Sequence, residues 1–234
     1  MKKSFFVSAV VVFCLFLLPR PEAFTWYDET HLAIAKAAGD KKWYNAAGPD
    51  IVKEKADLVE RRNHYYNNYG NVEVTPGMVL EQVSRYNNPD DEEGHLYGAI
   101  IASLRDYVNS KRSKKYSLYH VAYCAHYIGD LSQPQHNTLR DEFNKAYHDA
   151  NEALVENKVL GRIGKIEKYM YPIKLRADHF EEDLAKEIAR IANVSRELDR
   201  KLRQEERLMD AEEVYRQLGH SSSLLEAVLN HFKL

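Results

Sequence analysis

Apolar residues recur at helical spacing along most of the chain. Between Thr30 and Ala38 they return every three to four positions, which predicts a helix that ends at Gly39. The same spacing predicts helices at 51–59, 76–85, 96–108, 116–128, 143–155, 178–192 and 210–232. No stretch alternates convincingly with the period of two that a half-buried strand requires. The pattern therefore predicts an all-α fold, a single compact domain of several packed helices.

The segments between these helices carry weaker signals. We expect a break in helical structure at residues 46–50. We expect a loop rich in tyrosine and asparagine at 65–75 and an acidic loop at 87–94. Residues 196–206 carry dense charges of both signs at a spacing of four, which predicts a solvated helix face without chemistry of its own.

The first 25 residues have the three parts of a secretory signal. Lys2 and Lys3 precede an apolar run at 5–18, and residues 19–23 form a breaker region that ends in a small residue. The apolar run is shorter than the roughly 20 residues that a membrane span needs. Cleavage after Thr25 or after Ala23 would release a single domain, residues 26–234, from a secreted or periplasmic protein. An uncleaved N-terminal anchor is the alternative.

Overall charge and cysteine content narrow the function classes. The chain has 33 basic and 35 acidic residues, so no basic excess favours a stable nucleic-acid complex, although a total cannot reveal a local patch. Cys14 lies in the signal, which leaves Cys124 as the single thiol of the mature protein; its apolar helix predicts a small buried residue. An exported domain without disulfides depends on its core, or on metals that bind only the folded form.

Histidine and carboxylate residues are spaced as metal ligands in the middle of the chain. His126 and Asp130 stand four residues apart and share one helix face, and His148 and Glu152 repeat this spacing. Pro134 ends the first of these helices, so His136 leaves in a new direction. One such pair alone is most often a surface interaction. Two pairs with an additional histidine indicate a hydrolytic site with more than one metal.

Three further residues, which precede His126 in the sequence, complete a larger pattern. They are His31, Asp50 in Gly-Pro-Asp, and His64. With them the chain resembles the zinc-dependent phospholipase C superfamily, which also contains the fungal single-strand-specific nucleases. The most specific motif is His126-Tyr-Ile-Gly-Asp130-x-x-Gln-Pro-x-His136 followed by His148-x-x-x-Glu152. A smaller similarity, Arg207-Leu-Met-Asp-Ala211, matches the opening of the last helix in the bacterial phospholipases. The resemblance extends over essentially the whole mature chain.

The resemblance implies a site with three zinc ions. The first ion would take Asp50, His64, His126 and Asp130. The second would take His136, His148 and Glu152. The third would take His31, the other oxygen of Asp130, and the amino nitrogen and carbonyl oxygen of Trp26. In the family that tryptophan is the mature N-terminus, which favours cleavage after Thr25; after cleavage at Ala23, Trp26 would be a core aromatic residue.

The activity implied by the resemblance is hydrolysis of a phosphodiester. Water shared by zinc ions is acidified towards neutral pH and becomes a nucleophile, while the cations neutralise the phosphate oxygens. Asp50 is the expected residue to orient or deprotonate this water. Sequence alone does not separate this role from metal binding.

The sequence indicates the substrate less clearly than it indicates the reaction. Glu152 matches the bacterial phospholipases, where the nucleases have Asp, whereas the spacing of five from Trp26 to His31 resembles the nucleases. The aromatic wall of a choline site is missing, since Ile51 and Arg61 stand there. Arg61 could instead face an anionic headgroup, and Tyr65 and Tyr66 could line a lipid cleft or stack a base; a solvated helix end and simple packing are the alternatives.

Three functions therefore remain open. The leading prediction is a phospholipase C-like enzyme that acts on a phospholipid, with transient contact to a membrane surface. A nuclease on the same fold is the enzymatic alternative. A non-catalytic domain that keeps metals for stability and binds a lipid or a partner is the alternative of another class.

Overall fold

A computed structural model describes residues 28–70 and 72–234, and all regular structure in these two ranges is helical, as predicted. The signal segment and Trp26 lie outside the described residues. The α-helices are α2 (Asp28–Ala37), α3 (Gly48–Ala56), α4 (Leu58–Arg61), α5 (Pro76–Gln82), α6 (Leu96–Arg112), α7 (Leu118–Leu131), α8 (Glu142–Ala153), α9 (Glu156–Val159), α10 (Ile163–Glu167), α11 (Phe180–Glu205) and α12 (Ala211–Phe232). The short 3₁₀ turns are η1 (Trp43–Asn45), η2 (Val83–Arg85), η3 (Pro134–Asn137), η4 (Leu160–Arg162) and η5 (Ala177–His179).

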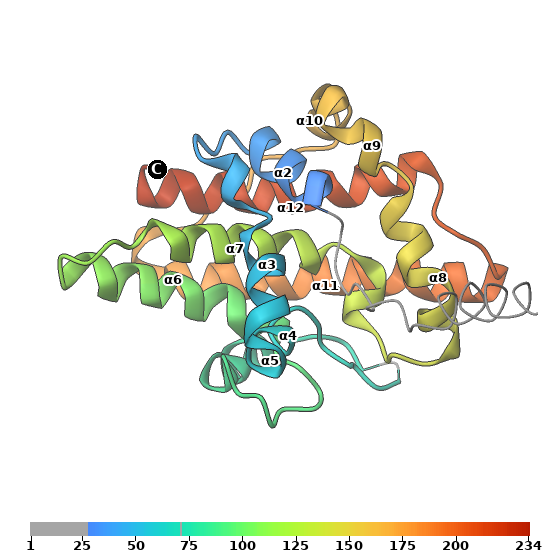
Figure 1. The fold of residues 1–234 in the computed structure, drawn as a ribbon, viewed down its shortest axis with the longest axis horizontal. Helices are drawn as coiled ribbons and strands as arrows, with labels where there is room; N and C mark the ends of the chain where they lie inside the picture. Colours follow the sequence, from blue (N-terminus) through green and yellow to red (C-terminus); the bar gives the residue numbers. More distant parts are fainter. Residues whose placement is uncertain (1–27, 71) are drawn as a thin grey trace, which may run out of the picture.

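Four long helices, α6, α7, α11 and α12, run along the long axis of the molecule (Figure 1). Helix α7 packs against α6, α11 and α12, and α2 packs on α7 and α12. The short helices α3 to α5 lie across the middle of the long ones, and α8 to α10 lie toward the end opposite the α6–α7 turn (Figure 1). Helix α7 is thus enclosed by its neighbours, so polar side chains on it are carried into the interior.

The core between these helices is built from aliphatic residues and a few tyrosines. Ile34 of α2, Ile100 of α6, Ile128 of α7 and Leu184 of α11 are all fully buried. Burying each such side chain stabilises the fold by about 1.5–3 kcal/mol relative to leaving it in water. A rigid scaffold of this kind can hold a polar cluster without disulfides.

Local sequence explains where the central helices end. Helix α7 ends at Leu131, and Pro134 then opens the turn η3, as its missing N–H requires. Asp210 caps α12 by accepting hydrogen bonds from the backbone N–H groups of Glu212 and Glu213, while the Glu213 side chain accepts from the N–H of Asp210.

One sequence-based prediction of structure was wrong, and a second was incomplete. Residues 48–50 are not a break but the first turn of α3, because Pro49 at the start of the helix suits the fixed φ of proline. The stretch 196–206 is not simply a solvated face: it is mostly the last part of α11, and Arg196, Asp199 and Leu202 are buried there. Helix α11 therefore extends well beyond the predicted end at 192.

The prediction for Cys124 is confirmed. Its side chain is fully buried, and burial raises the pKa of the thiol to about 12.

As for membrane insertion, none of the helices in 28–70 and 72–234 combines the length and apolar character needed to span a bilayer.

Candidate metal centre

The structure brings all eight predicted ligands within the described residues into the interior between α2, α3, α7, η3 and α8. They form three groups whose donor atoms lie within 4.8 Å of one another. We name each group by its carboxylate: the Asp130 group (His31, His126, Asp130), the Asp50 group (Asp50, His64, His126) and the Glu152 group (His136, His148, Glu152). The ninth predicted ligand, Trp26, lies outside the described residues.

Asp130 is the centre of the arrangement, and it is fully buried. Its Oδ2 lies 3.0 Å from His64 Nδ1 and 3.4 Å from His126 Nε2. Its Oδ1 lies 3.4 Å from His31 Nε2 and 3.4 Å from His136 Nδ1. One carboxylate thus faces four imidazole rings contributed by α2, α7, η3 and the bend after α4.

The Asp50 group lies beside it and shares His126. His126 Nε2 is 3.5 Å from Asp50 Oδ1 and 3.2 Å from His64 Nδ1. Asp50 is the most exposed of the eight side chains, at 15%. Solvent therefore reaches the cluster beside Asp50.

The Glu152 group joins the other two through His136. Its Nε2 lies 3.0 Å from His148 Nε2 and 3.4 Å from Glu152 Oε1, while its Nδ1 faces Asp130. His148 Nε2 lies 3.3 Å from Glu152 Oε1, one helical turn along α8. The rings of His136 and His148 are nearly parallel, with an interplanar angle of 5°. The eight side chains therefore form one continuous cluster.

Several rings are oriented by the nitrogen that does not face the cluster. His126 Nδ1 donates a hydrogen bond to the backbone oxygen of Ala46 at 2.8 Å, and His148 Nδ1 donates to Asp149 at 3.2 Å. His64 Nε2 lies 3.3 Å from Glu60 Oε1. A neutral imidazole carries its proton on only one ring nitrogen. If the nitrogen that points away from the cluster carries it, the lone pair of the second nitrogen is directed into the cluster. Metal-binding histidines are held in this way.

The donor set fits divalent cations of the zinc type. Zinc bonds of about 2.0–2.1 Å in a tetrahedron separate neighbouring donors by roughly 3.3 Å. Many donor pairs of the cluster lie at 3.2–3.5 Å, and the buried atoms Asp130 Oδ1, His136 Nδ1 and Glu152 Oε2 have no hydrogen-bond partner within the described part of the chain. Buried polar atoms normally have a partner. Cations between these groups would satisfy them.

Burial sets the charge state of the cluster without cations. It raises the pKa of Asp130 and Glu152 well above their ordinary values, and it lowers the pKa of His64 and His136. Burial also disfavours the charged form of His126, but the facing Asp50 and Asp130 outweigh this and raise its pKa to about 9. Cations would therefore favour the charged, ligating forms of Asp130 and Glu152, whereas Asp50, beside His126 and Lys53, has a pKa well below its ordinary value without them.

Two residues at the cluster were not predicted. Lys53, on α3, is buried and places its ammonium 2.7 Å from Asp50 Oδ1. Glu60 is buried and accepts a hydrogen bond from the Tyr127 hydroxyl at 2.7 Å while facing His64. Their spacings, three after Asp50 and four before His64, were visible in the sequence, but such pairs are common on exposed helices.

The suggested substrate-binding residues make contacts within the protein. Arg61 pairs with Asp57 at 3.6 Å. The Tyr65 hydroxyl accepts a hydrogen bond from Arg62. Tyr66 packs edge-on against Tyr97, with ring centroids 5.3 Å apart. Substrate binding by Arg61, Tyr65 and Tyr66 stays a prediction.

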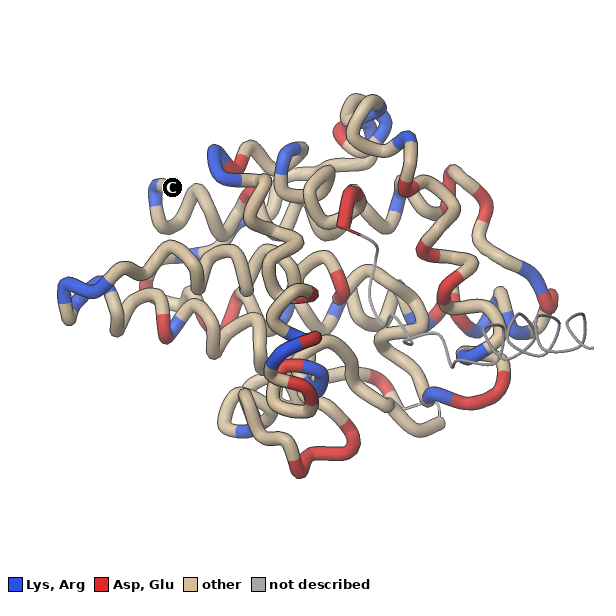
Figure 2. The backbone as a smooth tube through the Cα atoms, in the orientation of Figure 1, with Lys and Arg blue, Asp and Glu red and all other residues tan. Residues whose placement is uncertain are grey.

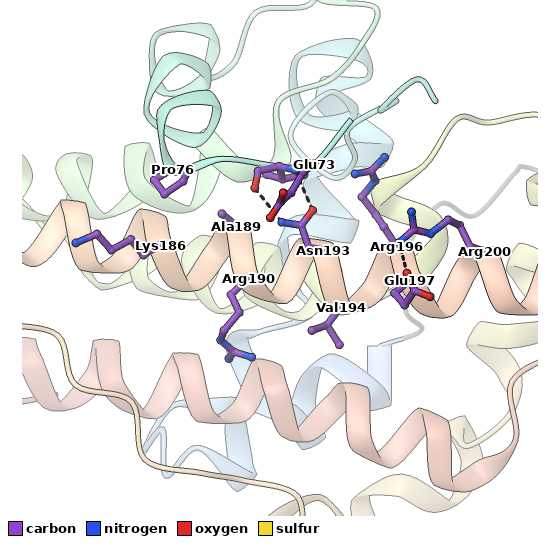
Figure 3. A pocket seen from close by; sticks show the side chains of 11 residues that line it. Glu73, Pro76, Lys186, Ala189, Arg190, Asn193, Val194, Arg196, Glu197 and Arg200 are labelled. Atoms are coloured by element: carbon purple, nitrogen blue, oxygen red, sulfur yellow. Dashed lines mark hydrogen bonds and ion pairs between the residues drawn. The ribbon is translucent and has the colours of Figure 1, made fainter. Parts of the chain in front are cut away.

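A cavity of about 710 Å³ lies elsewhere, along α11 (Figure 3). It is lined by Glu73, Val74, Pro76, Lys186, Ala189, Arg190, Asn193, Val194, Arg196, Glu197 and Arg200, none of which is a predicted ligand. The Asn193 side chain accepts a hydrogen bond from the Val74 N–H and donates one to the Val74 carbonyl oxygen, each 2.9 Å long. Arg196 donates to the backbone oxygens of Val72 and Gly70. This cavity wall therefore tethers the segment before α5 and is distinct from the cluster.

In comparisons with known proteins, no family model matches the chain, and no curated protein or solved structure matches it. The assignment of a family consequently stays a prediction from the motif.

Proposed function

We propose that this protein is a zinc-dependent phosphodiesterase, similar to the zinc phospholipases C, that hydrolyses a phospholipid at a three-metal site. One observation carries the proposal: eight histidine and carboxylate side chains, predicted as ligands from their spacing and from the family resemblance, form one largely buried cluster. An ordinary hydrophobic core would not contain them, because burying several ionisable groups without cations is costly.

The residues around the cluster have distinct roles in this proposal. Bound zinc would acidify water and neutralise phosphate oxygens. Asp50, on the side that solvent reaches, accepts the proton of the attacking water or orients it. The Lys53 ammonium fixes the Asp50 carboxylate and adds a positive charge where a phosphate would enter. The Ala46 backbone oxygen orients His126, and Glu60 faces the outer nitrogen of His64 at 3.3 Å.

The direct test measures metal content and hydrolysis together. Exported protein, with its N-terminus sequenced, is assayed on phosphatidylcholine, phosphatidylinositol and single-stranded DNA before and after treatment with a chelator. Hydrolysis of a phospholipid that requires zinc supports the proposal. Zinc-dependent cleavage of DNA alone would favour a nuclease, and metal retention without hydrolysis of any diester would favour a binding protein.

Asp130→Asn gives a sharper prediction, because Asn preserves shape and removes only the carboxylate charge. Burial raises the pKa of the Asp130 carboxyl well above its ordinary value and so disfavours its charged form in metal-free protein, and the neutral amide should therefore change metal-free stability by less than about 1 kcal/mol. It should nevertheless lower zinc content by at least one ion and abolish most of the stabilisation by zinc. Melting with and without zinc checks this, with Asp106→Asn on α6 as the control. An unchanged zinc effect contradicts the role of Asp130.

A further inference from the structure

The turn between α6 and α7 forms a basic projection at one end of the molecule (Figures 1 and 2). Six consecutive residues, 111–116, are exposed, and they include Lys111, Arg112, Lys114 and Lys115 but no acidic residue. Within the described residues, Arg112, Lys114 and Lys115 form no ion pair with a carboxylate. The projection therefore presents concentrated positive charge to the outside.

The backbone at Lys114 shows that a lysine is placed there at a cost. Lys114 has φ of 56°, in the left-handed region. Its N–H donates to the Lys111 oxygen, and the Lys115 N–H donates to the Ser110 oxygen, which is the Schellman pattern that ends a helix. Glycine or asparagine is preferred at this position because other side chains are strained. Lys114 and Lys115 also lie beyond the last turn of α6, so they add little to the stability of the helix.

Tyrosines flank this charge on the α7 side. Tyr116 is 66% exposed and Tyr119 is 45% exposed, and their rings stack with centroids 6.2 Å apart. Tyr123 and Tyr127 continue the row along α7, and Tyr127 reaches the His64 ring at 5.6 Å. Tyrosine combines an apolar ring with a polar tip, which suits the headgroup layer of a bilayer.

A second feature lies on the neighbouring face of α7, a pocket of about 270 Å³. Leu118, Val121, Ala122 and Leu234 contribute its apolar lining. Its polar lining has one acidic residue, Asp40, one amide, Asn45, and three lysines, namely Lys41, Lys42 and Lys233, so the lining is basic overall. Apolar surface bordered by ammonium groups complements an amphiphile with a negatively charged head.

We propose that this basic end, defined by Lys41, Lys42, Lys111, Arg112, Lys114, Lys115, Tyr116, Tyr119 and Lys233, docks the protein on a membrane containing anionic phospholipid. Clusters of lysine and arginine bind such surfaces, and each basic side chain strengthens binding roughly fivefold. Proteins that bind single-stranded nucleic acid usually do so in a basic groove that follows the backbone. This end is instead a projecting tip with exposed tyrosines and an apolar pocket, which fits a bilayer surface better.

The position of this end fits the proposed phosphodiesterase activity. The biological purpose of docking rests on that proposed function. Helix α7 leads from this turn to the cluster, and the rise of about 1.5 Å per residue places His126 and Asp130 roughly 10 and 17 Å along the helix from Tyr119. Docking through this end would therefore keep the proposed metal centre within one length of α7, roughly 20 Å, of the membrane surface.

The test is sedimentation with large vesicles of phosphatidylcholine alone and of phosphatidylcholine with one quarter phosphatidylserine. The full exported protein is used with its metals, and lipid hydrolysis is assayed in parallel so that binding is scored while the vesicles are intact. Native protein should bind the anionic vesicles at least tenfold more tightly, and more weakly as salt rises. The double variant Lys114→Gln/Lys115→Gln should lose roughly thirtyfold in partition coefficient. The matched control Lys158→Gln/Lys174→Gln, two exposed lysines elsewhere, should lose less than twofold.

Lys114→Gly provides an independent readout. Relief of the left-handed strain should raise the melting temperature, whereas loss of the charge should weaken binding to anionic vesicles roughly fivefold. A higher melting temperature with unchanged vesicle binding overturns the role of Lys114.

The remaining outcomes separate docking from catalysis. Equal binding to both vesicle types, or equal losses for the Lys114/Lys115 pair and its control, overturns the proposal. Binding to a thirty-residue thymidine oligonucleotide, weakened by the same double variant and without vesicle binding, overturns it in favour of nucleic acid. Anionic vesicle binding in a protein that hydrolyses no diester supports docking while contradicting the proposed enzyme activity.

Discussion

Gly129 shows at the residue scale how a missing side chain permits the cluster. It lies on α7 between His126 and Asp130, and a Cβ placed there would lie 2.5 Å from His31 Nδ1. Because glycine has no Cβ, the His31 ring can stack on the His126 ring with centroids 3.7 Å apart and reach Asp130. Gly129, which has no side chain to bind a metal, thus determines whether the His31 ring can approach Asp130.

Gly129→Ala should therefore displace His31 without removing any ligand. We expect the loss of one metal ion per chain and a destabilisation of about 1–3 kcal/mol from overpacking. Metal analysis and denaturant unfolding measure the two effects. Gly161→Ala is the control, because a Cβ at Gly161 meets no atom within 4 Å and the backbone there is unstrained. Native metal content in Gly129→Ala would show that His31 is not a ligand.

Four of the eight predicted ligands could be found because they follow the geometry of regular helices, whereas His31, Asp50 and His64 were predicted from the family resemblance. His126 with Asp130 and His148 with Glu152 obey the four-residue rule that places side chains on one face. The roles of Lys53 and Glu60 were not predictable, since they depend on how α3 and α4 pack against α7. Spacing within one helix says nothing about that packing.

At the scale of elements, α11 is more than a wall of the core. Its middle holds the segment before α5 through Asn193 and Arg196, which bond to peptide groups that no strand or helix pairs. The same segment continues from Tyr66, whose N–H donates to the backbone oxygen of His136 at 2.8 Å. Charge density alone predicted a solvated face here, because sequence does not show which long side chains fold back onto backbone oxygens.

Asn193→Ala should release this tether locally. Losing both hydrogen bonds to the buried Val74 peptide should cost about 1–3 kcal/mol and accelerate hydrogen exchange of the Val74 amide. Exchange measured by NMR and denaturant midpoints check this. Val194→Ala, the exposed neighbour on α11, should leave Val74 exchange unchanged. Unchanged exchange in Asn193→Ala as well would mean that Arg196 alone holds the segment.

At the scale of the whole molecule, the long apolar periods predicted the all-α architecture. The short helices α9 and α10 were missed, since their few residues show too little periodicity. The order in which helices pack was not predictable, because the same amphipathic faces allow several arrangements. The stability of the assembled fold also depends on pH through groups outside the cluster.

His220 on α12 supplies one such dependence. Burial, with Arg190 and Arg216 nearby, lowers the pKa of His220 from an ordinary 6.5 to about 4, and its Nδ1 lies 3.0 Å from the Tyr171 hydroxyl. Between these pH values the unfolded chain binds a proton that the folded one does not, so stability falls as pH falls from 6.5 to 4. We expect a contribution of about 1–3 kcal/mol, reduced by partial exposure.

The check compares native protein with His220→Gln in chelator-treated form, so that the metal centre contributes equally to both. Urea unfolding is measured at intervals between pH 7 and pH 4. The native protein should lose more stability over this interval than the variant. Parallel losses in the two proteins would assign the pH dependence to other histidines.

His136 has a consequence for how such a centre could change over time. One ring nitrogen faces Asp130 and the other faces His148 and Glu152, so a member of the Glu152 group also contacts the Asp130 group. A rotation of the ring that improves its contact with one side would withdraw it from the other. A substitution at His136 would therefore disturb both groups at once, so that the two could not change independently at this position.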